Sequence, residues 1–176
     1  MSREIPPAND PRVRVRTAAR PDPDGRVVVY WMQRAQRAED NPALDTAIAA
    51  ANELRLPVVV LFVLAPGFPG ANLRHFQFML EGLVELPDAL SARGAGFVLR
   101  VGQPPAEVTR FCVDARAALL VSDENPLRET ERWRGHVAEE LRIPFWTVDA
   151  DVVVPSVLLE KEQWSAGTMR PRVTRQ

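Results

Sequence analysis

Two polar segments of the sequence hold side chains suited to binding a small molecule. The first, residues 31–41 (WMQRAQRAEDN), follows a run of apolar residues and contains Arg34 and Arg37. Guanidinium groups bind phosphates and carboxylates, and the Trp31 indole can stack on a flat ring. This segment therefore predicts a site for a planar or anionic ligand.

The second segment, residues 122–128 (SDENPLR), follows another apolar run and is rich in acidic and amide groups. We expect the two segments to form opposite sides of one crevice. The candidate ligand-binding residues are Trp31, Met32, Arg34, Arg37, Asp123, Glu124, Asn125, Leu127 and Arg128.

Each segment also has a purely structural interpretation. In a solvated loop, Arg34 and Arg37 would form ion pairs with Glu39 and Asp40. Asn125, which precedes a proline, would cap a helix. The adjacent carboxylates at 123 and 124 do not make an acid–base pair, because that requires a substrate between two groups with separated pKa values. We predict no catalytic residue.

Metal-binding and nucleotide-binding motifs are missing from the sequence. Its two histidines, His75 and His136, and its single cysteine, Cys112, show no metal-ligand spacing. There is no G-x-G-x-x-G after the first apolar run, no G-K-[ST] phosphate loop and no G-x-S-x-G elbow. We expect no metal, no dinucleotide clamp, and a buried, apolar role for Cys112.

Apolar runs predict the elements that position the two segments. Continuous runs of β-branched and aromatic residues are typical of strands buried on both faces, and five occur, at 26–32, 57–64, 97–101, 118–122 and 143–148. Helices are expected at 41–54, 72–93, 104–116 and 127–141, with a short one at 156–164. The helix over 72–93 carries an apolar face made of Leu73, Phe76, Leu80, Leu83 and Leu90.

Strands that alternate with helices predict a parallel sheet with helices on both faces. We expect an α/β domain with a doubly wound, Rossmann-like sheet of five parallel strands in the order 3-2-1-4-5. Ligands bind such sheets beyond the carboxyl ends of the strands where the winding reverses, which places the crevice between the loops after strands 1 and 4. The expected boundaries are an extended arm at 1–25, the domain at 26–155, and a C-terminal helix and linker at 156–176.

Composition excludes several classes of function. The formal net charge of −1 offers no basic surplus, and phosphate neutralisation carries most of the affinity for nucleic acid, so we expect no direct DNA binding. No apolar run reaches the ~20 residues of a membrane span, and the N-terminus does not resemble a signal peptide. We expect a cytoplasmic protein without membrane contact.

Five segments, in order, resemble class II DNA photolyases. They are VVVYWMQRAQRAEDN (27–41), LRHFQFMLEGL (73–83), SDENPLR (122–128), VDADVVVP (148–155) and SAGTMRPRV (165–173). The likeness implies the N-terminal α/β antenna domain of the photolyase and cryptochrome family, and the chain is expected to lack the helical FAD domain that follows in that family. Departures from the usual pattern fall at Ala35, Glu124-Asn125 and Asp151-Val152.

The resemblance implies a light-harvesting role in DNA photorepair. The implied cofactor is an antenna pigment, either 8-hydroxydeazaflavin or FMN, FAD or methenyl-folate, without an FAD site of the catalytic type. Such a domain is not competent for repair alone, so enzyme activity of this photolyase-like (lyase) chain stays open. Two alternatives remain: a pigment-free subunit that pairs with a separate flavin-domain polypeptide, and an independent nucleotide enzyme. The missing phosphate loop argues against the second alternative.

Overall fold

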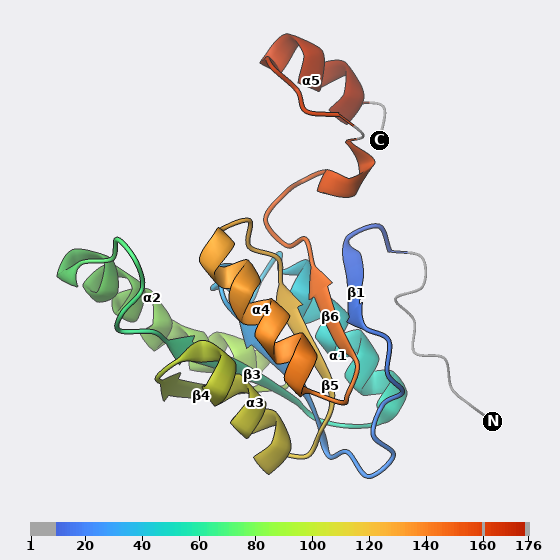
Figure 1. The fold of residues 1–176 in the computed structure, drawn as a ribbon, viewed down its shortest axis with the longest axis vertical. Coiled ribbons are helices and arrows are strands. Elements are labelled where there is room, and N and C mark those ends of the chain that lie inside the picture. The colour runs from blue at the N-terminus through green and yellow to red at the C-terminus, as the bar shows by residue number, and fades with distance from the viewer. Residues whose placement is uncertain (1–9, 160, 175–176) are drawn as a thin grey trace.

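The computed structural model describes residues 10–159 and 161–174, and within them six strands form one sheet (Figure 1). The strands β2 (Val27–Met32), β3 (Val58–Leu64), β4 (Ala95–Val101), β5 (Ala117–Asp123) and β6 (Phe145–Val148) are parallel. The strand β1 (Val13–Thr17) runs antiparallel to β6 at the edge, and the order is β1-β6-β5-β2-β3-β4.

The five predicted strands are present in the predicted order, but the sheet contains one strand more than expected. β1 lies in the proline-rich segment that we expected to be an extended arm, and its register places Val13 opposite Val148 and Val15 opposite Trp146. Four residues of alternating valine and arginine, followed by a threonine, give a weak strand signal on their own. Pairing with β6 supplies the missing stabilisation, because the edge of β6 offers free backbone groups. Residues 1–9 of the predicted arm lie outside the described residues.

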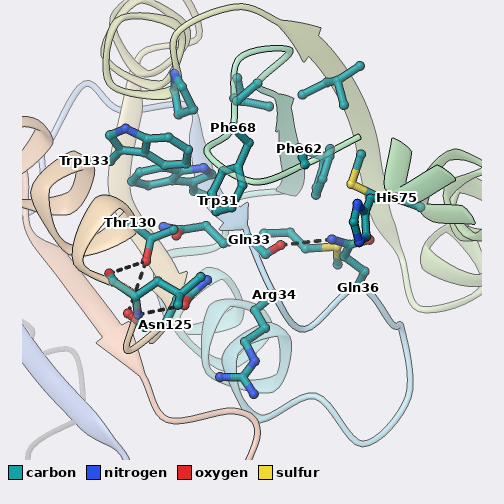
Figure 2. A pocket seen from close by; sticks show the side chains of 18 of the residues that line it. Trp31, Gln33, Arg34, Gln36, Phe62, Phe68, His75, Asn125, Thr130 and Trp133 are labelled. Atoms are coloured by element: carbon teal, nitrogen blue, oxygen red, sulfur yellow. Dashed lines mark hydrogen bonds between the residues drawn. The ribbon is translucent and has the colours of Figure 1, made fainter. Parts of the chain in front are cut away.

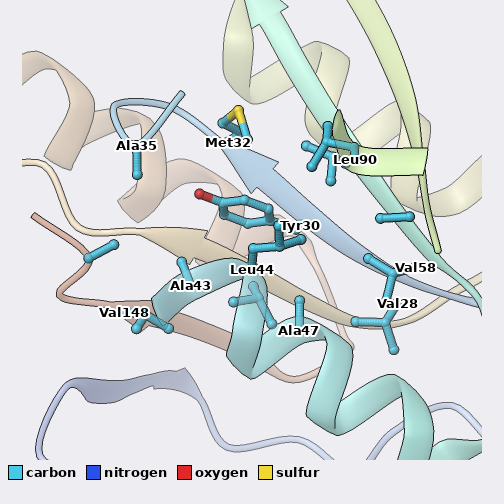
Figure 3. Close-up of a cluster of buried hydrophobic side chains, with 14 of the residues drawn as sticks. Val28, Tyr30, Met32, Ala35, Ala43, Leu44, Ala47, Val58, Leu90 and Val148 are labelled. Carbon is cyan, nitrogen blue, oxygen red and sulfur yellow. The ribbon is translucent and has the colours of Figure 1, made fainter. Parts of the chain in front are cut away.

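Helices cover both faces of the sheet, as predicted. α1 (Pro42–Leu54) and α2 (Leu73–Ala92) lie on one face, and α3 (Pro104–Asp114) and α4 (Arg128–Glu140) lie on the other (Figure 1). Successive strand residues point to opposite faces. Val28, Tyr30 and Met32 of β2 accordingly pack in the cluster under α1 and α2 (Figure 3), whereas Val27, Val29 and Trp31 pack in the cluster under α3 and α4.

The predicted start of α1 is confirmed. The side-chain oxygen of Asn41 accepts hydrogen bonds from the backbone N–H groups of Ala43 and Leu44, both at 3.1 Å, and proline occupies the first helical position. Asn41 is fully buried, and its amide nitrogen also donates to the carbonyl oxygens of Ala35 and Arg37. The cap therefore joins α1 to the polar loop that follows β2.

Only the second half of α2 follows the predicted apolar face. Leu83 and Leu90 are buried, whereas Leu73 is 81% exposed and Leu80 is 37% exposed. The apolar face is buried only in part, because the first half of α2 extends beyond the edge of the sheet and has little core to pack against (Figure 1). The predicted stop is confirmed, since Gly94 after the helix has a φ of +75°.

The C-terminal segment differs from the predicted helix over 156–164. Among the described residues of that range only a single 3₁₀ turn forms, η1 (Ser156–Leu158), and the Asp149 carboxylate accepts from the Ser156 backbone N–H at 2.9 Å. The prediction fails because Val157 and Leu158 find no core surface to cover. A later helix, α5 (Ala166–Val173), lies away from the sheet in Figure 1 and buries none of its residues. None of the described helices is long and apolar enough to cross a membrane.

Candidate functional site

A cavity of about 550 Å³ opens at the carboxyl ends of β2, β3 and β5 (Figure 2). β2 and β5 are neighbours in the sheet, and the chain leaves β2 toward β3 on one side and returns to β5 on the other, so the cavity lies where the winding reverses. It therefore occupies the place that the sequence predicts for the crevice. It also extends further than predicted, along β3 and the first turns of α2.

Aromatic side chains form the walls of this cavity. Trp31 comes from the end of β2, Phe68 from the loop between β3 and α2, and Trp133 from α4. The rings of Phe68 and Trp133 meet edge to face, with centroids 5.7 Å apart and an interplanar angle of 74°. Trp31 is only 1% exposed, because it belongs to the core as well as to the cavity wall. Figure 2 shows these three rings on one side of the cavity.

Several polar atoms on the cavity wall have hydrogen-bonding capacity to spare. The Gln36 amide nitrogen donates to the Gln33 carbonyl oxygen at 3.1 Å, and the Gln36 side-chain oxygen accepts from none of the described residues. His75 Nδ1 accepts from the Asn72 backbone N–H at 3.1 Å, which places the proton of the neutral ring on Nε2. The side-chain oxygen of Asn125 accepts from Leu127 N–H at 3.2 Å, leaving its amide nitrogen without an acceptor among the described residues.

The loop after β2 is held in place by the buried carboxylate of Asp123. One carboxylate oxygen accepts hydrogen bonds from the Gln33 backbone N–H at 2.8 Å and from the Tyr30 hydroxyl at 3.2 Å. The other oxygen accepts from the backbone N–H groups of Arg34 at 2.5 Å and Ala35 at 3.0 Å. Burial raises the pKa of Asp123, and the three amide donors oppose that shift. Burial likewise raises the pKa of Tyr30 well above its ordinary value.

A buried arginine on α4 joins the two polar loops. The Arg134 guanidinium is 2% exposed and donates to the Asn125 carbonyl oxygen at 2.6 Å and to the Gln33 side-chain oxygen at 3.3 Å. It also pairs with Glu131 at 2.6 Å, one turn earlier on the helix. Burial lowers the pKa of Arg134, and Glu131 opposes that shift. Arg134 therefore sets the distance between the two sides of the cavity.

The structure brings some of the nine predicted site residues to the cavity and places the others elsewhere. Those that line it are Trp31, Met32, Arg34, Asn125 and Leu127; those that do not are Arg37, Asp123, Glu124 and Arg128. Asp123 lies behind the loop it holds. Glu124 turns toward β1 and β6, where it accepts from the Thr147 hydroxyl at 2.9 Å and faces Arg16 at 3.6 Å. Arg128 begins α4 and is exposed.

The arginines of the first loop form ion pairs, but with a partner other than the one in the purely structural interpretation. Arg34 and Arg37 both pair with the Asp151 carboxylate, at 2.8 and 3.5 Å, instead of with the carboxylates of Glu39 and Asp40. At Asp40, the Arg37 guanidinium donates to the backbone oxygen and not to the carboxylate. The pairing differs from the one in the structural interpretation because the segment after β6 passes beside this loop and brings Asp151, far away in the sequence, within reach.

The expected helix cap at Asn125 is also corrected. α4 begins at Arg128, and the residue before it, Leu127, makes no side-chain cap. Asn125 instead closes a short turn onto the Leu127 N–H. Its backbone oxygen accepts from Thr130 and Arg134, so it connects the loop to the helix it precedes.

Several residues of the cavity carry no distinctive signal in the sequence. Trp133 fits the apolar periodicity of a helix, and Arg134 reads as part of a surface ion pair with Glu131. Phe68 gives the clearest sequence signal of a cavity residue. It lies between glycines and prolines in the segment APGFPGAN, where an aromatic ring does not belong to the apolar face of a strand or helix. No cluster of three potential metal ligands occurs in the described part of the chain.

Comparison with known proteins places the chain among proteins of one family. Residues 28–174 match the family described as DNA photolyase. The chain is 39% identical over 165 residues to a deoxyribodipyrimidine photo-lyase of Methanothermobacter thermautotrophicus, covering 93% of this chain and 37% of that protein. It is 36% identical over 148 residues to that of Potorous tridactylus, covering 82% of this chain and 28% of the relative. The chain thus spans about a third of the length of these curated relatives.

Solved structures agree on the fold. A Synechocystis cryptochrome aligns with a TM-score of 0.57 at 15% identity, over 65% of this chain and 25% of the cryptochrome chain. At that identity the likeness concerns the fold alone.

Proposed function

The chain belongs to the DNA photolyase family, and from that premise we propose that it is an antenna domain whose cavity binds a planar, light-absorbing pigment. The observation that carries the proposal is the aromatic cavity of about 550 Å³ at the carboxyl ends of β2, β3 and β5. Pockets for small organic ligands have about 300–1,000 Å³ and combine apolar walls with a few placed polar groups.

The wall chemistry favours a heterocyclic ring. Phe68 and Trp133 offer aromatic surface to a flat conjugated system, and the buried Trp31 supports the cavity wall. The spare polar atoms of Gln36, His75 and Asn125 supply an acceptor and two donors for the ring's edge, which suits the alternating carbonyl and N–H groups of a flavin or deazaflavin pyrimidine ring.

A phosphate group contributes little to binding in this proposal. Arg34 is the one arginine on the described cavity wall, and Asp151 already neutralises it at 2.8 Å. α3 begins with two prolines, which lack the backbone N–H groups that could hold an anion. Riboflavin, which carries no phosphate, is therefore expected to bind about as tightly as FMN.

The role in photorepair is light capture. Relatives about three times as long are named deoxyribodipyrimidine photo-lyase. The energy absorbed by the pigment would pass to a redox-active flavin held by another domain, and the repair reaction would take place there. The net charge of −1 agrees with a domain that does not itself bind DNA.

Pigment titration tests the proposal. The purified chain is mixed in turn with riboflavin, FMN, a deazaflavin and methenyl-folate, and binding is followed by pigment fluorescence and by co-elution in gel filtration. We expect Phe68→Ala to weaken binding by about tenfold or more, because it removes a stacking wall. Phe78→Ala is the matched control, since Phe78 is 81% exposed and does not line the cavity. If no candidate pigment binds, or if the two variants lose equal affinity, the proposal is wrong.

A further inference from the structure

The first half of α2 carries an apolar stripe that the domain leaves uncovered. Leu73 is 81% exposed, Leu80 37% and Val84 76%. At 3.6 residues per turn these three side chains fall within about 40° of one another around the helix axis. A shallow groove of about 400 Å³ runs along them. Buried residues of α2 occur only from Leu83 onward, on a different side of the helix.

The charges along α2 run against the preference of an isolated helix. Arg74 and His75 lie in the first turn, which contains no acidic residue, and Glu81, Glu85 and Asp88 follow toward a last turn that contains no basic residue. The positive end of the helix dipole favours acidic side chains and the negative end favours basic ones, so this order is unfavourable within one helix. Neither Arg74 nor Glu85 forms an ion pair with any other described residue.

An antiparallel copy of the same helix removes both defects. We propose that two copies of this chain associate through α2, with the stripes Leu73–Leu80–Val84 packed against each other around a two-fold axis near residues 78–79. A two-fold axis makes the contact self-complementary, because each patch faces its own equivalent. Leu73 of one copy then lies opposite Val84 of the other, and the two Leu80 side chains lie near the axis.

The same arrangement brings opposite charges together. In antiparallel helix pairs, residues on one flank face the same flank of the other helix. Arg74 lies on the flank of α2 that also carries Glu81 and Glu85, so Arg74 of each copy faces those carboxylates of the other. In Figure 1 the first half of α2 extends away from the sheet, and its apolar stripe is exposed. The pairing does not depend on whether the cavity holds a pigment.

Sedimentation equilibrium of the 176-residue chain over a concentration series tests the association. We expect a reversible monomer–dimer equilibrium for the wild type. Val84→Arg should raise the dissociation constant by at least about tenfold, because it places a charge in the centre of an apolar contact. Phe78→Arg is the matched control: Phe78 is an equally exposed apolar residue of α2, but it points more than about 100° away from the stripe, so it should leave the constant unchanged.

Charge exchange tests the orientation and guards against misfolded variants. Arg74→Glu alone places a carboxylate opposite Glu81 and Glu85 of the other copy, and Glu85→Arg alone places a guanidinium opposite Arg74. Each variant should therefore dimerise more weakly than the wild type at low salt. An equimolar mixture of the two restores the opposite-charge contact between positions 74 and 85 at both ends of the pair, so a heterodimer should form more tightly than the homodimer of either variant.

Three results would overturn the pairing. The first is a wild type that stays monomeric throughout the concentration series, which would leave the stripe to a partner of different sequence. The second is an equal effect of Val84→Arg and Phe78→Arg. The third is a mixture of Arg74→Glu and Glu85→Arg that remains monomeric while the wild type dimerises.

Discussion

Asp123 illustrates how one side chain can shape a cavity that it does not line. The sequence offers this carboxylate as a ligand-binding group, and the structure uses it to hold three consecutive amide N–H groups of the loop after β2. Such buried polar groups are costly when unpaired, so the loop and Asp123 depend on each other. The shape of the cavity wall at Gln33 and Arg34 follows from this contact.

Asp123→Asn should therefore destabilise the domain. In asparagine an NH2 group, which is a donor, replaces one carboxylate oxygen. The backbone N–H groups that it faces then lack an acceptor, at a cost of about 1–3 kcal/mol for each unpaired group. Denaturant unfolding measures the loss. Asp45→Asn is the control, because Asp45 is exposed and pairs only with Arg93, and its loss should stay below about 0.5 kcal/mol. Equal losses for the two variants would contradict the assigned role of Asp123.

At the scale of elements, β1 is attached to the domain by more than its backbone pairing. Arg16 of β1 donates to both carboxylate oxygens of Glu131 on α4, one of them at 3.0 Å. Arg12, just before β1, donates to the backbone oxygens of Val152 and Val153 in the segment after β6. The strand thus connects a helix on one face of the sheet with the C-terminal segment.

The contact between β1 and α4 should make stability depend on pH. Hydrogen bonds from Arg16, and secondarily from Arg134, lower the pKa of Glu131 from 4.5 to about 2. The unfolded chain binds this proton more readily, so the contact stabilises the fold fully above pH 4.5 and loses its effect as the pH falls toward 2. Glu131 is about half exposed, so screening limits the contribution to roughly 1 kcal/mol.

Glu131→Gln isolates this contribution. The difference in unfolding free energy between wild type and variant should be constant from neutral pH down to about pH 5 and should then shrink toward pH 2. Urea unfolding at a series of pH values provides the measurement. A difference that persists unchanged at pH 2 would show that the contact does not depend on the Glu131 charge.

For the whole molecule, the helices on each side protect residues on both faces of the sheet. Cys112 on α3 is 3% exposed in the cluster under α3 and α4, as expected from the sequence, and burial raises the pKa of its thiol to about 12. Thiolate is the reactive species, so the folded protein should react with thiol reagents only when it opens.

Labelling of Cys112 should consequently report unfolding of the entire domain. We expect slow labelling in buffer and a rate that rises with denaturant as steeply as the global unfolding equilibrium does. A Val113→Cys variant in a Cys112→Ala background is the control, because Val113 is 65% exposed and its cysteine should label at once. A Cys112 labelling rate that does not change with denaturant concentration would instead indicate local opening of α3.

The sequence by itself determines the parallel sheet, its strand order and the location of the cavity. Runs such as 27–32 and 117–123 are apolar on both faces, which requires helices on each side, and the chirality of the crossovers then places the loops after them at one edge. The helix start at Asn41 and the stop at Gly94 follow from local backbone chemistry alone.

Only the tertiary structure decides which side chains face the cavity. Contacts between residues far apart in sequence turn Asp123 inward, attach Arg37 to Asp151 and place Arg134 between the two loops. Local patterns cannot encode such pairings, because the partners meet only after the strands align. For the same reason the sequence does not predict β1 or the exposure of the first half of α2. β1 gains its stability from pairing with β6 at the edge of the sheet. The first half of α2 extends beyond the core against which its apolar residues would otherwise pack.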